Sequence, residues 1–194
     1  MTEEAAKIVI VAGGFVGLLV WIVALACYRR MASAAESEFF EAELPGREPE
    51  DAIAAVVDQV KQYANMAKFS RPTPTSFSVE QFGIQTHFAA ERHGGAPTRL
   101  VAGVDDSRMR RWFQVAMGLL VLLIMPMVIF GLCTALWVWA APVAGRWPQR
   151  QTWQIVQMIH VLWPPFLIYY QWRQLRGRVR AMVTNLFVLI GAGT

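Results

Sequence analysis

The feature that most constrains this chain is a run of twenty residues without a charge, residues 8–27, which reads IVIVAGGFVGLLVWIVALAC. A helix rises about 1.5 Å per residue, so this run spans about 30 Å, the thickness of the hydrocarbon core of a bilayer. Glu3 and Glu4 precede the run, where a secretory signal peptide would carry positive charge. Arg29 and Arg30 follow it directly. We therefore expect a first transmembrane helix that ends at arginines.

A second apolar segment covers residues 112–141. It is longer than a perpendicular crossing requires, which predicts tilt. Pro126 lies near its middle and predicts a kink, because proline cannot donate a helical hydrogen bond. Trp112 and Trp137 suit the two membrane interfaces, where tryptophan is enriched.

A third apolar segment, residues 153–172, is less uniform. We expect a transmembrane helix that is distorted or broken at Pro164–Pro165. The short link that precedes it predicts an antiparallel hairpin with the second helix. A last apolar stretch, residues 181–192, is too short for an ordinary crossing, and we expect it to lie in the interface, to re-enter the membrane or to pack on the hairpin.

Composition and charge support this organisation. The chain is 55% hydrophobic and 16% charged, whereas soluble domains are about 25% charged. Residues 31–107 contain 12 acidic and 6 basic residues, a net charge of −6. This sign is opposite to that of a nucleic-acid-binding domain, so we expect no nucleic-acid partner.

The distribution of arginine and lysine predicts the orientation. If the N-terminus lies outside, nine basic residues flank the inner ends of the helices and three flank the outer ends. Such a bias places the inserted domain and the C-terminus in the cytoplasm. The Ala- and Arg-rich composition favours a bacterial inner membrane.

The predicted inserted domain, residues 31–107, has the pattern of a small α+β fold. Residues 38–44 alternate as a strand does, and Pro49 followed by Glu50 and Asp51 marks a helix start that we extend to about Lys68. Three alternating runs follow, with a turn signal at residues 93–97, and these predict an antiparallel meander. The expected order is β-α-β-β-β. The expected architecture therefore has three transmembrane helices and one α+β domain inserted between helices 1 and 2. Residues 1–30 contain the first helix, and residues 108–172 contain the hairpin of the second and third helices. Residues 173–194 form a basic segment with an apolar tail.

A polar stripe in the third helix is the first candidate site. Gln154, Gln157 and His160 recur every third residue, and ionisable groups inside membranes are often functional. The stripe could line a polar cavity or hold a ligand, and His160 is a candidate haem ligand. One histidine is too few for a bis-histidine haem site in a single chain, and a neutral histidine that bonds to a neighbouring helix is the structural alternative. We therefore predict no cofactor, no metal site and no catalytic residue.

Two further motifs concern packing and lipid. Gly13 and Gly17 form a Gly-x-x-x-Gly pair of the kind that lets two membrane helices approach closely. Four arginines after the third segment could bind anionic lipid headgroups or serve only to fix topology; these are Arg173, Arg176, Arg178 and Arg180.

The function that fits these patterns is a non-catalytic integral membrane protein, a subunit, scaffold or regulator of a membrane assembly. Its expected partners are the lipid bilayer and other membrane-protein subunits or further copies of the chain. The alternative is a transport protein or a ligand- or cofactor-binding protein that uses the polar stripe as an oligomer. A third hypothesis is an enzyme that acts on lipid or uses a redox cofactor.

Overall fold

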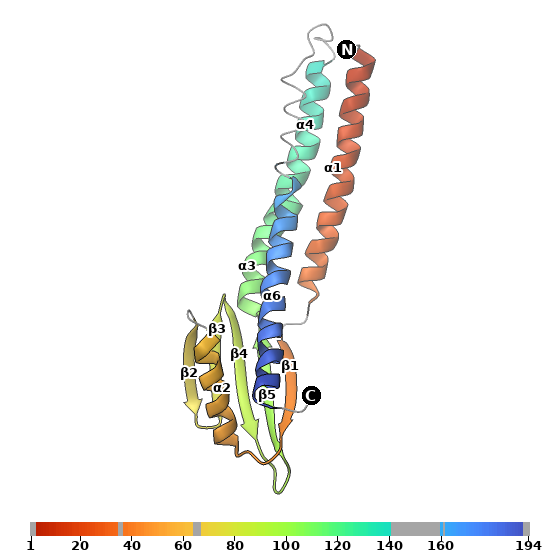
Figure 1. Ribbon diagram of the computed structural model, residues 1–194. Coiled ribbons are helices and arrows are strands. Elements are labelled where there is room, and N and C mark those ends of the chain that lie inside the picture. Colours follow the sequence, from red (N-terminus) through yellow and green to blue (C-terminus); the bar gives the residue numbers. More distant parts are fainter. Residues whose placement is uncertain (1–2, 35–36, 64–66, 141–159, 161, 192–194) are drawn as a thin grey trace. The chain divides into compact units, whose positions relative to one another are not determined.

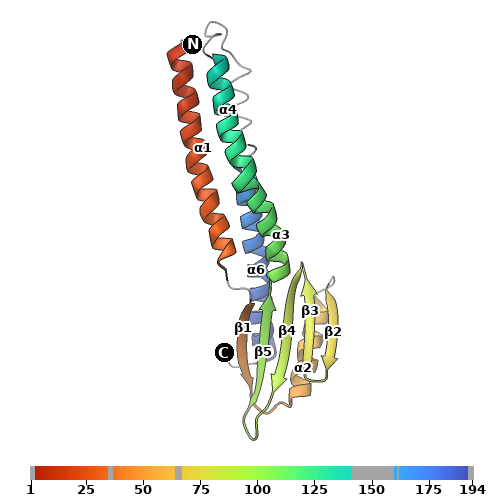
Figure 2. The ribbon, with the colours of Figure 1, turned by 180° about the vertical axis from the view of Figure 1, so that it is seen from behind.

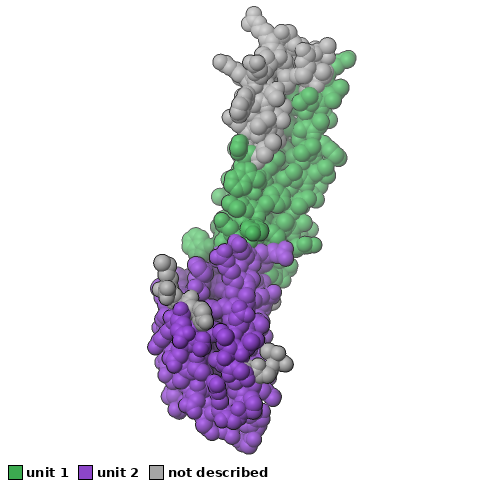
Figure 3. Space-filling model, viewed as in Figure 1, with its two compact units in different colours: residues 1–34, 112–171 green, residues 35–111, 172–194 purple. Residues whose placement is uncertain are grey.

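The computed structural model describes the chain except residues 1–2, 35–36, 64–66, 141–159, 161 and 192–194. It divides into two compact units, coloured separately in Figure 3. The helical unit comprises Met1–Ala34 and Trp112–Gln171, and the α+β unit comprises Ala35–Arg111 and Trp172–Thr194. Each unit is described by itself.

The helical unit is built on two antiparallel helical segments (Figure 1). The first is α1 (Glu3–Ala32). The second is a continuous run of α3 (Ser107–Gly118), which enters this unit at Trp112, a π-helical turn η1 (Leu119–Ile124) and α4 (Met125–Ala140). Two helices of the described chain, Lys7–Ala32 and Ser107–Val138, are long and apolar enough to cross a membrane. Length and composition of this kind are also met by signal sequences and by core helices of soluble proteins.

The α1 face that meets the second segment follows a seam with alternating steps of three and four residues. Ile10 packs with Leu136, Gly14 lies opposite Cys133, and Trp21 bonds to Val121. Gly17, between Gly14 and Trp21, and Ala24, after Trp21, are the buried residues at the remaining seam positions. This spacing is the 3.5-residue period of helices packed at a small crossing angle.

The α+β unit contains a five-stranded antiparallel sheet, which confirms the predicted α+β class. The elements are β1 (Ser37–Leu44), α2 (Pro49–Tyr63), β2 (Lys68–Thr73), β3 (Ser76–Gln81), β4 (Ile84–Glu91), β5 (Thr98–Asp105) and the C-terminal part of α6 (Pro164–Leu189). The strand order is β1-β5-β4-β3-β2. Figures 1 and 2 show α2 and the end of α6 on the same face of the sheet.

The core lies between the sheet and these two helices. Alternate residues of each central strand are buried, as in Ile84, Thr86, Phe88 and Ala90 of β4. Phe77 of β3 stacks against Phe88. From the helices come the buried residues Ala52, Ile53, Val56, Val57 and Val60 of α2 and Val179, Val183, Leu186 and Phe187 of α6.

Two expectations about the sheet were wrong. The sequence predicted four strands, but β2 adds a fifth, with register shifts between Ser70 and Thr73. Its residues are exposed on both faces and include Pro72, so it shows no alternation. Proline is tolerated there because β2 is an edge strand. The predicted helix end at about Lys68 was also wrong, because α2 ends at Tyr63 and Lys68 already belongs to β2.

The C-terminal region also differs from the expectation. A third crossing over residues 153–172 is not shown, because most of this segment lies outside the described residues and α6 begins at Pro164. α6 then continues through the arginines to Leu189. For the stretch 181–192 the expected placements were the interface, re-entry into the membrane or packing on the hairpin; its residues up to Ile190 instead belong to the α+β unit, and Val183 is fully buried. The buried positions 179, 183, 186, 187 and 190 follow a helical stripe that suits packing on a sheet.

Candidate functional site

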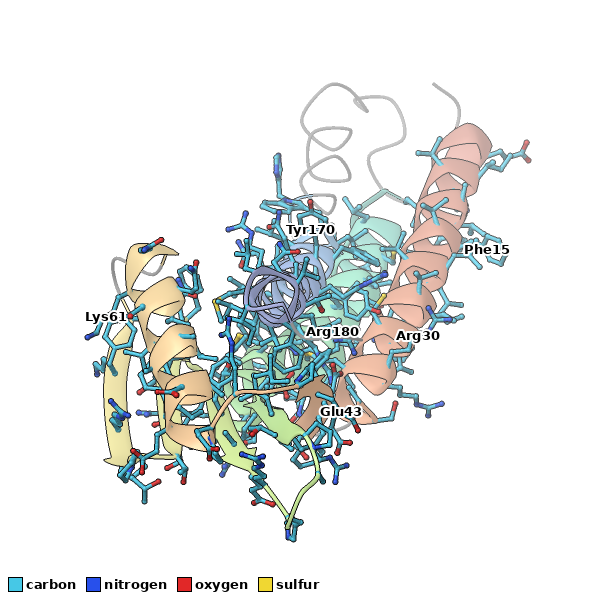
Figure 4. The ribbon with its side chains drawn as sticks, turned by 60° about the horizontal axis from the view of Figure 1, so that its bottom comes forward. Phe15, Arg30, Glu43, Lys61, Tyr170 and Arg180 are labelled. Atoms are coloured by element: carbon cyan, nitrogen blue, oxygen red, sulfur yellow. The ribbon has the colours of Figure 1, made fainter. Side chains whose placement is uncertain are left out.

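A group of four charged residues in the α+β unit joins β1, the β5–α3 junction and α6. Glu38 lies at the start of β1, Asp106 lies between β5 and α3, and Arg176 and Arg180 lie one helical turn apart on α6. Figure 4 labels Arg180 on this helix. We call these four residues the charge cluster.

Glu38 is the centre of the charge cluster. Its carboxylate accepts hydrogen bonds from Arg176 Nη2 and from both Nε and Nη2 of Arg180. The side chains of Glu38 and Arg176 are 18% and 12% exposed, so water screens this pair only weakly. The hydrogen bond from Arg180 is the largest cause of a lowered pKa at Glu38, and the charges of Arg176 and Arg180 add to it. The same bond raises the pKa of Arg180.

Asp106 is the deeply buried acid of the charge cluster, with a side chain that is 2% exposed. Arg176 Nε lies 3.5 Å from its Oδ2 atom, and neither carboxylate oxygen has a hydrogen-bond partner in the described part of the chain. Burial raises the pKa of Asp106, and the charges of Arg176 and Arg110 act against this rise. The neighbouring Asp105 instead accepts a hydrogen bond of 2.8 Å from the backbone of Ser107 and so caps α3.

The geometry of the charge cluster suits a structural tie. Its two arginines face acids from β1 and from the end of β5, so the ion pairs fasten α6 to one end of the sheet. Sequence reasoning missed this arrangement because Glu38 is 138 residues from Arg176 and 142 from Arg180. The available signal was the spacing of Arg176 and Arg180, which places both on one face of a helix.

A second polar feature lies in the helical unit, at the π-helical turn. Met125 donates its backbone N–H to Leu120, five residues earlier. In this register the next donor, to Val121, would be residue 126, which is proline and has no N–H. The indole Nε1 of Trp21 donates to the Val121 oxygen instead, at 2.7 Å. A carbonyl left without its helical donor is thus satisfied from α1, which pins the two helices in register.

Of the predicted glycine pair, only Gly17 lies in the α1 seam. Gly17 is buried and Gly13 is half-buried. The close approach occurs at Gly14, where an added Cβ would lie 3.3 Å from Cys133 Sγ.

The predicted arginine run divides between two environments. Arg176 and Arg180 are paired within the charge cluster, where Arg176 is 12% and Arg180 is 52% exposed, whereas Arg173 and Arg178 are exposed and lie outside that cluster. Their role in lipid binding or topology stays a prediction.

The polar stripe is only partly visible. His160 is exposed, whereas Gln154 and Gln157 lie outside the described residues. The hypotheses of a polar cavity or a haem ligand at His160 therefore stay predictions. Among the described residues, no three His, Cys, Asp or Glu side chains gather as a metal site would require.

Comparison of the chain with family models, with curated proteins and with solved structures found no match.

Proposed function

We propose that this protein is a membrane-anchored, non-catalytic component of a larger assembly, with its α+β unit on the cytoplasmic side. The observation that supports the anchor is the exposed apolar surface of the two long helices. Only 17% of the most apolar window of the first helix and 22% of that of the second is buried. Phe15 projects outward from α1 with 61% of its surface exposed (Figure 4). A buried core helix of a soluble protein would not leave such residues uncovered, whereas a bilayer covers them.

The non-catalytic part of the proposal is supported by the charge cluster. Catalytic acids and bases need a path to a substrate. Here the largely buried Glu38, Asp106 and Arg176 and the half-exposed Arg180 face one another between β1, the residue after β5 and α6, and Glu38 is already bonded by two arginines. This arrangement stabilises the domain and leaves Glu38 committed to its arginine partners.

The uncovered face of the sheet is the surface that we assign to a partner protein. Phe39 of β1 is 69% exposed on this face. A Cβ added to Gly103, its partner on β5, would lie 3.2 Å from the Phe39 ring, so the ring rests on the glycine. Beside it, Glu41 pairs with Arg99. A well-supported aromatic side chain that remains exposed is typical of an interface anchor.

The test is gentle detergent extraction of the full-length protein followed by native mass spectrometry. We expect the protein to require detergent and to carry a stoichiometric partner or a second copy. Phe39→Ser should lose that species, whereas Val188→Ser should keep it. Val188 is the matched control because it is 63% exposed on α6, which lies on the opposite face of the sheet. A protein that is soluble and monomeric without detergent would contradict the proposal.

A further inference from the structure

The β3–β4 hairpin has an unusual tip. Phe82 and Gly83 form its two-residue turn, with φ angles of 56° and 75°. Both angles are positive, which defines a type I′ turn, where Asn-Gly is the usual sequence. Among the described residues, Phe82 is the non-glycine residue with a positive φ. A bulky aromatic residue in this conformation is strained, because its Cβ crowds the backbone.

Folding does not explain this choice of residue. The Phe82 side chain is 56% exposed, so it contributes little to the core. Gln81 and Ile84 pair normally on either side of the turn, so a smaller turn residue would leave the hairpin register unchanged. A strained aromatic side chain that faces outward indicates a contact made outside the domain.

The surroundings of the tip indicate what that contact is. A Cβ added to Gly83 would lie 3.7 Å from Cβ of Met109, so the turn packs against the first turn of α3. Arg108 lies 3.9 Å from Glu80, at the end of β3, and its side chain is 78% exposed. Three cations come just before the apolar run beginning at Trp112; Arg110 is buried, whereas Arg108 and Arg111 are exposed. Met109 precedes Trp112 by three residues, a rise of about 4.5 Å along a helix.

We infer that the hairpin tip is a membrane-contact element, in which Phe82 enters the headgroup–acyl boundary of the bilayer while Arg108 and Arg111 face the phosphates. This inference rests on the proposed membrane crossing of the helix that begins with α3. A tip packed beside the last residues before the apolar run lies at the depth of the headgroups. Aromatic rings favour this zone, and arginines there attract anionic lipid. The contact orients the sheet relative to the membrane surface at a second point, besides the chain connection itself.

The experiment uses nitroxide labels on the full-length protein in vesicles that contain anionic lipid. Single cysteines are placed by Phe82→Cys, Gly95→Cys and Leu122→Cys, each with Cys27→Ala and Cys133→Ala. Gly95 is the matched control, because it lies in the turn after the opposite end of β4 and an added Cβ there meets nothing within 4 Å. Leu122 is 56% exposed on the helix proposed to span the membrane. Collision rates with oxygen, which dissolves in lipid, and with a water-soluble nickel complex report the depth of each label.

We expect oxygen collisions to dominate at Leu122→Cys and Phe82→Cys, with the shallower value at Phe82→Cys, and nickel collisions to dominate at Gly95→Cys. If Phe82→Cys matches Gly95→Cys while Leu122→Cys remains in lipid, the inference fails and the proposed crossing stands. A Phe82→Cys label shielded from both reagents would show a protein contact and would also overturn the inference. If Leu122→Cys is reached by nickel, the proposed crossing itself fails.

Discussion

Single residues decide the stability of both units, and the clearest case is the hydrogen bond from Trp21 to Val121. Trp21→Phe removes the donor and leaves a carbonyl unsatisfied in apolar surroundings. We expect a loss of about 1 kcal/mol in the free energy of unfolding of the helical unit. Denaturation of the purified protein in detergent micelles measures it. Trp112→Phe is the control, because Trp112 is 73% exposed.

Pro126→Ala tests the physical cause of that bond. Alanine supplies the missing backbone N–H, so the Val121 carbonyl no longer depends on Trp21. In this background Trp21→Phe should cost less than half of what it costs in the original chain. Equal costs in both backgrounds would show that Pro126 is not the reason for the Trp21 bond.

Glu38 and Asp106 should affect acid stability in opposite directions. The lowered pKa of Glu38 means that its ion pairs stabilise the fold above its ordinary pKa of 4.5 and are lost as the pH falls through the folded value. The raised pKa of Asp106 means that its ionisation opposes folding as the pH rises above 3.8.

Glu38→Gln should therefore cost about 2 kcal/mol at pH 7, because it leaves two arginines without their main partner. It should also flatten the loss of stability on acidification, whereas Asp106→Asn should make that loss steeper. Thermal unfolding followed by circular dichroism between pH 3.5 and 7 measures both slopes. The account of the charge cluster is wrong if Glu38→Gln keeps the slope of the original chain.

Replacement of Phe82 should raise the stability of the α+β unit, whereas the substitutions at Trp21 and Glu38 should lower stability. Phe82→Asn places a residue that tolerates positive φ at the first turn position. We expect the α+β unit to gain about 1 kcal/mol in its free energy of unfolding. Pulse proteolysis in urea measures this gain. A loss of stability would show that the Phe82 side chain is part of the core after all.

At the scale of elements, the end of α6 differs most from the expectation, because it packs on the sheet of the α+β unit. Val183→Ala should destabilise the α+β unit by about 2 kcal/mol, because the side chain is fully buried. Val188→Ala should change it by less than about 0.5 kcal/mol, because Val188 is exposed. Pulse proteolysis in urea compares the two variants. Equal and small effects would mean that this stretch does not pack on the sheet.

The elements with regular periodicity were predictable. Alternation located β3, β4 and β5, and Pro49 with its acids located the start of α2. β2 escaped because an edge strand needs no buried face. The packing of the end of α6 on the sheet was not predicted, because the expectation used the total hydropathy of residues 181–192 and not the helical spacing of their apolar side chains. Glu38 and Arg180 could not be paired from the sequence, since their contact is set by tertiary packing over 142 residues.

At the scale of the whole molecule, the central claim is that α1 and the α3–η1–α4 run cross a bilayer in opposite directions and leave the α+β unit on the side rich in arginine. The claim depends on apolar residues exposed along both helices, such as Phe15 and Leu122. It also depends on the five arginines at their inner ends, which are Arg29, Arg30, Arg108, Arg110 and Arg111, against the three basic residues at the outer ends.

The most direct measurement is labelling of Glu4→Cys and Gly95→Cys, each without Cys27 and Cys133, by a membrane-impermeant maleimide in intact cells. Both positions are exposed, one at the start of α1 and one in the β4–β5 turn. We predict that Glu4→Cys is labelled at once and that Gly95→Cys is labelled only after the membrane is permeabilised. Labelling of both positions from the same side would show that α1 does not cross the membrane.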